Sequence, residues 1–339
     1  LYVRDPMIAP STEGAVENGS RTEPFRVRER ALQYAQKNGK NSLRLSAGRY
    51  PLRQAIELSG NMLISGGYSP DNWAPGGREA TIIYPQAGFS DDTLLSSGSA
   101  LSLRKIYLVD SGQALGSLVR MDSGRLEINA SNLAVTRSER GILVNDGVLD
   151  ISNSVVSCND PLAVTLIELH SARCQLLATT LESTELPPIL LKNQGLADYR
   201  LLSGQNSNIT IRDSDLKPRR GLVTTAILLR GGSLDFSGKG ISAGSGTLSA
   251  TGVDISLQAK ATLNNCRIYG ETTAGNTVLL RAKDASLNLT ECELVLQGNA
   301  GIYGVTAENV ELKIGKSQIQ AGKSLDFMTV LSAKYSLLE

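Results

Sequence analysis

The chain repeats one phrase, Leu126-Glu127-Ile128-Asn129-Ala130-Ser131-Asn132-Leu133, which returns as Leu149-Asp150-Ile151-Ser152-Asn153-Ser154-Val155-Val156. The shared template is an apolar residue, any residue, an apolar residue, two spacers, a small residue, any residue and an apolar residue. Further copies surround Ile211, Leu289 and Ile314. Because self-similarity at a fixed period is typical of repeat architectures, this phrase says more about the fold than any single motif.

Alignment of the copies on their second apolar residue gives nine anchors, whose sequence numbers increase by 25, 23, 25, 35, 25, 27, 26 and 25. The position five places after the anchor is apolar in all nine copies, whereas a chain with 41% hydrophobic residues would show about four by chance. The position three places after it is mostly Ser, Thr or Cys, and the register also places Lys239 at this inward position. The anchors are Leu103, Ile128, Ile151, Leu176, Ile211, Phe236, Leu263, Leu289 and Ile314.

A period of this length, with strand-like alternation and no helical stripe, is typical of a right-handed parallel β-helix. Leucine-rich repeats need a Leu/Asn consensus that this chain lacks, and propeller blades need roughly 40–50 residues. In a β-helix, successive turns stack about 4.8 Å apart, so equivalent side chains form ladders along the axis. We therefore predict an all-β solenoid of about 11 coils.

The coils are expected to divide the chain into an irregular beginning and a regular remainder. Residues 85–339 are predicted to form coils of about 25 residues, with an insertion at about 186–208 where one step lengthens to 35. Residues 1–84 are predicted to form an N-terminal cap and the first coils, with a short amphipathic helix at about 26–38. Because an exposed solenoid end presents unpaired strand edges, this helix is the expected cap.

Composition and charge exclude several classes of protein. The chain has 34 Lys and Arg against 33 Asp and Glu, so it lacks the basic excess of a nucleic-acid binder. It has no apolar run long enough for a transmembrane helix.

The four cysteines lack zinc-site spacing, and we expect them to be buried thiols with Cys266 and Cys292 stacked in consecutive coils. No signal sequence is visible at Leu1, which predicts a removed signal or a trimmed chain.

The beginning of the chain carries a series of short phrases that resembles the pectin-lyase-like superfamily of right-handed β-helices. Within that superfamily it is most similar to uncharacterised bacterial envelope proteins and lipoproteins. The resemblance covers residues 24–84 and implies the β-helix fold with a bacterial envelope or extracellular location. The phrases are Pro24-Phe25, Ala31-Leu32-x-x-Ala35, Ala47-Gly48-x-Tyr50 and Ile64-x-Gly66-Gly67-Tyr68, with Trp73 close behind.

The superfamily includes polysaccharide lyases, glycoside hydrolases and pectin esterases, but their signature residues are missing here. The one histidine lies in Leu169-His170-Ser171, which is not the Gly-His-Gly of the polygalacturonase-like enzymes. The best candidates for catalysis are Asp213, Asp215, Lys217 and Arg219. Alternation places both aspartates outward on one face, where they would hold Ca²⁺ and an acidic sugar or simply form a solvated ion-paired surface.

Two further groups of residues are candidates for binding. Tyr199 and Arg200 lie in the insertion, where a helical turn at about 195–202 is expected to project from the rod. Insertions in solenoid proteins often carry the functional residues. Tyr68 and Trp73, with Tyr84, would form a small stacking site near the N-terminal end or pack between the cap and the first coil.

These observations predict a noncatalytic envelope or surface protein, a rigid scaffold or binding module for carbohydrate or another protein. The alternative is a polysaccharide lyase or glycoside hydrolase with a non-standard site, and a third reading is a fragment of a larger adhesin. No resident cofactor or metal is expected, and Ca²⁺ is expected only if the protein is an enzyme. The oligomeric state is left open.

Overall fold

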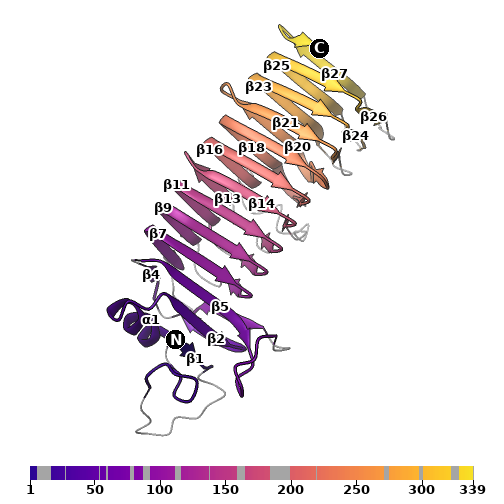
Figure 1. Ribbon diagram of the computed structural model, residues 1–339. Coiled ribbons are helices and arrows are strands. Elements are labelled where there is room, and N and C mark those ends of the chain that lie inside the picture. The colour runs from indigo at the N-terminus through magenta and orange to yellow at the C-terminus, as the bar shows by residue number, and fades with distance from the viewer. Residues whose placement is uncertain are drawn as a thin grey trace.

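The computed structural model describes residues 1–5, 17–26, 28–52, 54–58, 60–76, 80–86, 92–110, 116–136, 138–158, 165–183, 199–218, 220–270, 275–297, 301–321 and 328–338. They form a parallel β-solenoid of about 10 turns, with 71% of these described residues in strands (Figure 1). All pairs between the named strands of the described residues are parallel, and each strand away from the two ends pairs with its counterparts in the turns before and after it. The predicted all-β solenoid is therefore confirmed.

Two sheets run the length of the rod. Sheet A has 17 strands among the described residues, and sheet B has 11 shorter strands in strictly sequential order. Sheet A comprises β1 (Tyr2–Val3), β2 (Ser42–Ser46), β4 (Ile56–Leu58), β5 (Met62–Tyr68), β7 (Leu94–Arg104), β9 (Ser117–Asn129), β11 (Arg140–Ser152), β13 (Thr165–His170), β14 (Arg173–Leu177), β16 (Tyr199–Arg212), β18 (Arg220–Ser237), β20 (Ser245–Ser256), β21 (Lys260–Asn264), β23 (Asn276–Thr290), β25 (Ile302–Gly315), β27 (Met328–Lys334) and β28 (Leu337–Leu338). Sheet B comprises β3 (Gly48–Leu52), β6 (Thr81–Pro85), β8 (Tyr107–Val109), β10 (Asn132–Val135), β12 (Val155–Cys158), β15 (Thr180–Ser183), β17 (Asp215–Lys217), β19 (Gly240–Ser242), β22 (Arg267–Tyr269), β24 (Glu293–Leu296) and β26 (Gln318–Ala321).

Each turn bends where single residues adopt the left-handed conformation. One bend divides the sheet A portion of a turn into a first arm and a second arm, as at Asp146 (φ 48°) and Asn206 (φ 49°). A second bend leads from the second arm to sheet B, and it falls two places after the anchor in all nine copies. Asn and Asp tolerate this conformation better than most residues, which explains Asn153, Asp213 and Asn265 at the second bend.

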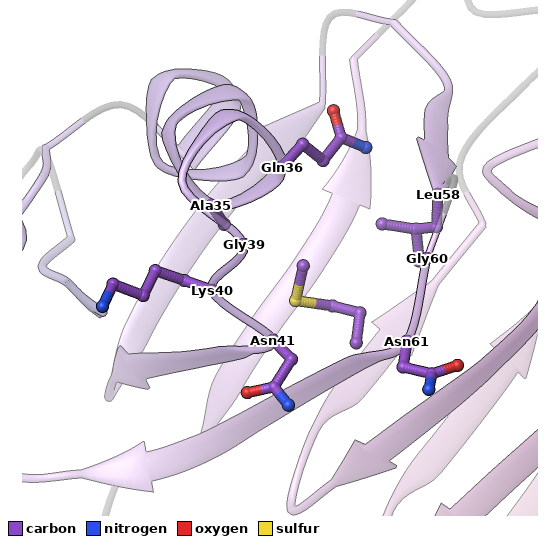
Figure 2. A pocket seen from close by; sticks show the side chains of 9 residues that line it. Ala35, Gln36, Gly39, Lys40, Asn41, Leu58, Gly60 and Asn61 are labelled. Carbon is purple, nitrogen blue, oxygen red and sulfur yellow. The ribbon is translucent and has the colours of Figure 1, made fainter.

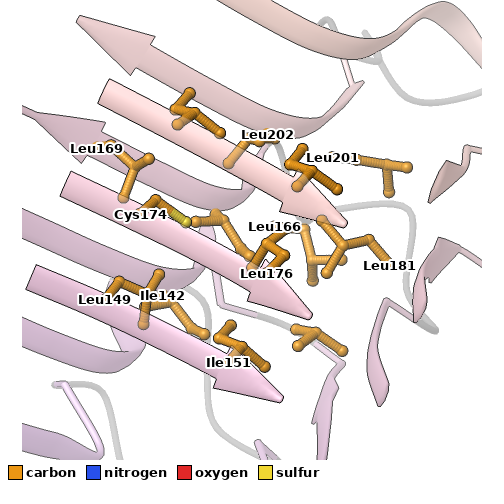
Figure 3. Packing of buried hydrophobic residues seen from close by; sticks show 14 of the residues in the cluster. Ile142, Leu149, Ile151, Leu166, Leu169, Cys174, Leu176, Leu181, Leu201 and Leu202 are labelled. Atoms are coloured by element: carbon orange, nitrogen blue, oxygen red, sulfur yellow. The ribbon is translucent and has the colours of Figure 1, made fainter. Parts of the chain in front are cut away.

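The predicted ladders form the core. Each anchor pairs with the next along the rod, including Leu176 with Ile211 across the long step. The ladder five places later is equally buried, with Leu133, Val156 and Leu294 at most 1% exposed. Figure 3 shows core side chains of this kind packed between turns. A single turn cannot bury its own faces, so the stability of each turn depends on its neighbours.

The ladder of small residues at the second bend also has a hydrogen-bonding role. The Oγ of Ser131 accepts a hydrogen bond from the backbone N–H of Ile106 in the preceding turn, at 3.2 Å. Ser154 does the same for Ser131 at 3.1 Å, and Ser214 for Thr179 at 3.0 Å. These hydroxyls satisfy backbone groups that the sharp bend removes from the sheet ladder.

Two details of the predicted ladders are wrong. Lys239 is exposed and points to the outside, because it follows Gly238, whose φ of 101° differs from the 46–55° of the other bends. Ile314 and Ile319 are 37% and 36% exposed, because the last turn lacks a complete neighbour among the described residues.

The helix α1 (Arg28–Lys37) lies within the predicted 26–38 and covers the N-terminal end of the rod (Figure 1). Ala31, Leu32 and Ala35 are buried on its inner side, together with Phe25 just before it. The segment predicted as an insertion lies partly outside the described residues. Its described portion, 199–208, belongs to the long strand β16, so residues 199–202 do not form the expected helical turn.

Candidate functional site

The outer face of the first arm carries a line of polar side chains that crosses seven successive turns. We call this set the polar row; its members are Arg120, Asp122, Asn145, Glu168, His170, Gln205, Arg230, Asp254 and Arg281. The inward residues that alternate with them, such as Met121 and Leu169, are fully buried. Six steps of about 4.8 Å give the row a length of about 29 Å, which suits an extended ligand better than a compact one.

A cluster of three charged or titratable groups forms near the centre of the polar row. Glu168 and His170 lie two places apart on β13, and His170 Nε2 is 2.9 Å from Glu168 Oε1. Arg140 reaches the row from the start of β11 and places Nε 2.5 Å from Glu168 Oε2. The carboxylate therefore orients both a guanidinium and the only imidazole of the chain. Glu168 is 21% exposed and His170 35%, so both remain accessible.

A second network lies on the N-terminal side of this cluster. Arg120 Nε is 2.9 Å from Asp122, and its Nη1 is 3.6 Å from Asp92. Asn145 in the next turn donates to Asp122 at 2.6 Å. Desolvation raises the pKa of Asp122, but the hydrogen bonds from Asn145 and Arg120 outweigh it, so the pKa falls below its usual value.

On the C-terminal side, Asp254 of β20 lies 3.3 Å from Arg281 Nη1 of β23. Burial raises the pKa of Asp254, and the positive charges of Arg281, Arg230 and Arg200 offset only part of that effect. Shifted carboxylates are common at functional sites. The outer face of the second arm also carries ion pairs, among them Arg125 with Glu127, whose side chains are 54% and 40% exposed.

Sequence reasoning missed the polar row. Its members are separated by whole turns of the chain, and only the parallel register brings Asn145, His170 and Gln205 side by side. The polar row could have been found from the sequence by aligning the outward-facing positions of the first arms between coils, in the same register as the anchors.

The predicted catalytic group is not assembled as expected. Asp213 occupies the second bend with φ 49°, so the alternation that would place it on one face with Asp215 is interrupted. Asp215 on β17 instead has two cations at 3.5 Å and 3.7 Å, Lys217 and Lys239. Arg219 lies outside the described residues. This arrangement is an ion-paired surface on sheet B.

The two binding residues predicted in the insertion differ in their surroundings. Tyr199 packs against the core, and burial raises the pKa of its hydroxyl well above the usual value. It is therefore not an exposed binding residue. Arg200 is half-buried at the start of β16, where its charge acts on Asp254 of the polar row.

The aromatic residues near the N-terminal end are mostly structural. Trp73 is 5% exposed, and its indole N–H donates to the carbonyl of Arg21 at 3.1 Å. Its ring therefore packs under the N-terminal segment and offers no open stacking surface, which decides between the two alternatives for this residue. Tyr68 and Tyr84 are half-buried, and each carries an arginine over its ring, Arg44 and Arg49 respectively.

Figure 2 shows a pocket of about 310 Å³ between the end of α1 and strands β4 and β5. Leu58 and Met62 form its apolar side, and Asn41 and Asn61 flank it with amide groups. Gln36 is held by a hydrogen bond of 3.1 Å to the carbonyl of Glu57. The pocket reaches the size of a small-molecule site, but among its lining residues Lys40 alone is charged.

In the part of the chain that the structure describes, no group of three His, Cys, Asp or Glu is placed to hold a metal ion. No helix there is long and apolar enough to cross a bilayer. The four cysteines are buried, and Cys266 Sγ lies 3.4 Å from Cys292 Sγ, which confirms the expected stacking.

The strand order, register and coil length define a parallel β-helix. DFA-IIIase from Arthrobacter chlorophenolicus A6 is similar with a TM-score of 0.57 and 9% identity, over 99% of this chain and 94% of that one. Its C387A mutant in complex with DFA-III gives 0.54 and 9%, over 94% and 84%. The A-module of mannuronan C-5 epimerase AlgE4 from Azotobacter vinelandii gives 0.46 and 12%, over 99% and 100%.

At these identities the similarity shows the fold alone. No protein-family model matches the sequence, and no curated protein sequence matches it. A shared fold does not define a function, which depends on the residues that form the site.

Proposed function

We propose that the protein is a noncatalytic binding module of the bacterial envelope or surface, in which the rigid rod holds the polar row against an extended carbohydrate chain. The observation that supports this is the polar row itself, in which, over the described residues, all members except Gln205 and Arg230 have a hydrogen bond or ion pair to a neighbouring side chain. Side chains fixed in this way lose little conformational entropy when a ligand binds. The location is part of the proposal and rests on the resemblance of residues 24–84.

The row itself carries both charge signs in equal number, three arginines and three carboxylates, and a fourth arginine lies at its edge. Arg120, Arg230 and Arg281 belong to it, and Arg140 adds a fourth guanidinium from the start of β11. Guanidinium groups bind carboxylates in bidentate geometry, so an acidic polysaccharide is the preferred ligand within the carbohydrates. The crystal complex of the DFA-IIIase mutant with DFA-III is consistent with a ligand site on this kind of scaffold.

The test is affinity electrophoresis in gels that contain polygalacturonate, alginate or a neutral glucan. We expect retardation by the acidic polymers and a loss of at least about tenfold in affinity for Arg140→Gln combined with Glu168→Gln. The matched control is Arg125→Gln combined with Glu127→Gln, which removes the same charges from the second arm. Equal retardation of both variants, with circular dichroism showing both folded, would exclude the polar row as the binding surface.

A second candidate is a polysaccharide-active enzyme, and the contact of 2.9 Å between His170 and Glu168 favours it. An imidazole oriented by a carboxylate is a suitable general base, and Arg140 would neutralise the carboxylate of a uronic acid. Incubation of the same polymers with and without Ca²⁺ tests this, by absorbance of unsaturated products and by new reducing ends. Products that disappear in His170→Asn, while binding persists, would establish the enzyme and overturn the noncatalytic proposal.

A further inference from the structure

A cluster of arginine and aromatic residues lies at the N-terminal end of the rod, away from the polar row. Tyr2 on β1 pairs in register with Arg44 on β2, and Figure 1 shows these strands together beside α1. The hydroxyl of Tyr2 accepts hydrogen bonds from Arg21 Nε at 2.9 Å and from Arg44 Nη1 at 2.7 Å. Two guanidinium groups therefore converge on a single oxygen atom.

The aromatic rings keep both guanidinium groups in place. Arg21 and Arg44 lie over the ring of Tyr2, at 5.6 Å and 5.4 Å from its centroid, and Arg44 also lies 5.8 Å from the centroid of Tyr68. Trp73 packs edge-on against Tyr2 at 4.8 Å and holds the carbonyl of Arg21. The cations are thus positioned by the fold before any ligand binds.

A third cation adds to the cluster. Arg4 lies 6.0 Å from the Trp73 centroid, and its Nε is buried without a hydrogen-bond partner. Over the described ranges of the chain, none of the three guanidinium groups forms an ion pair with a carboxylate. Positive charges held close together without a counter-charge repel one another, and a bound anion would remove that repulsion.

We propose that Arg21, Arg44 and the Tyr2 hydroxyl form a binding site for an oxyanion, a phosphate, sulfate or carboxylate group, with Arg4 adding charge at its base. Because the phenolic oxygen accepts both arginine bonds, its own hydrogen is left to donate to a ligand. Planar guanidinium groups match the oxygens of these anions. Arg21 is exposed and Tyr2 and Arg44 are half-buried, so the site is open to solvent. The site is independent of the function proposed above.

Trp73, the only tryptophan of the chain, reports on this site directly because it contacts Tyr2 and Arg4. Tryptophan fluorescence is titrated with inorganic phosphate, and separately with sulfate and galacturonate, against sodium chloride at matched ionic strength. We expect a saturable change with the oxyanions and none with chloride. A change that follows ionic strength alone overturns the site.

Three variants test which groups bind. Arg21→Gln and Arg44→Gln are expected to weaken phosphate binding at least about tenfold, and Tyr2→Phe to weaken it severalfold without a loss of charge. Arg104→Gln, an exposed arginine on β7, is the matched control and should bind as the wild type does. Unchanged binding in the folded Arg21→Gln and Tyr2→Phe proteins overturns the proposal, as does equal weakening in Arg104→Gln.

Discussion

The stacking of turns makes a sharp prediction about Ile151. This side chain is 1% exposed and lies between Ile128 in the preceding turn and Leu176 in the next. Figure 3 shows Ile151 and Leu176 in neighbouring turns. Ile151→Ala removes about three methyl or methylene groups, which is ~2.4 kcal/mol of transfer free energy at ~0.8 kcal/mol each. The cavity left between two rigid turns adds to this, so we expect a loss of about 3–5 kcal/mol in the free energy of unfolding.

The matched control is Ile314→Ala, the same substitution at the same position of the repeat. Ile314 is 37% exposed and has an anchor neighbour on the Leu289 side only, among the residues that the structure describes. About two thirds of its side chain is buried, and solvent fills the space that the substitution opens. The expected loss is therefore about 1.5 kcal/mol or less.

Urea unfolding followed by circular dichroism measures both values, and hydrogen exchange locates the turns that open. Because each turn is stabilised by its neighbours, Ile151→Ala should expose the amides of several adjacent turns, whereas Ile314→Ala should expose only the last. Equal losses of stability in the two variants would refute the argument that the anchors form one stacked ladder.

Three other predictions concern the bends, the pH dependence and the thiols. Asn153 has φ 49°, so Asn153→Gly should be nearly neutral and Asn153→Val should cost roughly 1–2 kcal/mol in urea unfolding; equal effects would contradict the bend. The pKa of Asp122 is lowered in the folded state, so its stabilisation is present above the unfolded value of 3.8 and is lost as pH falls through the lower folded value. Between about pH 5 and pH 2 the free energy of unfolding should therefore fall less in Asp122→Asn than in the wild type. The difference should be less than about 1 kcal/mol, because the carboxylate is partly exposed. Identical pH profiles of stability in the two proteins would contradict this prediction. All four cysteines are buried thiols, so a thiol reagent should find four reactive groups only after denaturation, and fewer than four would indicate a disulfide.

The local sequence pattern was sufficient to predict the repeat, because equivalent positions in most turns have similar burial and a similar backbone conformation. The anchor, the small residue three places later and the apolar residue five places later recur wherever the second arm meets sheet B at a bend. Ile128, Ser131 and Leu133 could therefore be assigned from spacing alone, and their burial and pairing agree. The assignment failed at Lys239, where a glycine changes the geometry of the bend without changing the spacing.

The candidate sites depend on contacts between turns, and these are set by register and side-chain direction. Asp213 and Asp215 are close in sequence, yet Asp213 itself has the left-handed conformation, which interrupts the strand alternation between them. Arg140 and Glu168 are 28 residues apart, yet they meet because β11 and β13 are neighbours. Trp73 looked like a candidate platform in the sequence, but the N-terminal segment covers it.

The sequence by itself determined the solenoid, its period and its buried ladders, because burial of a repeated apolar pattern needs only the period and the alternation of a strand. Only the tertiary structure decided which polar groups meet on the outside of the rod. Outward positions have no packing requirement that would mark them in the sequence, so the polar row and the arginines around Tyr2 became visible only once the turns were stacked.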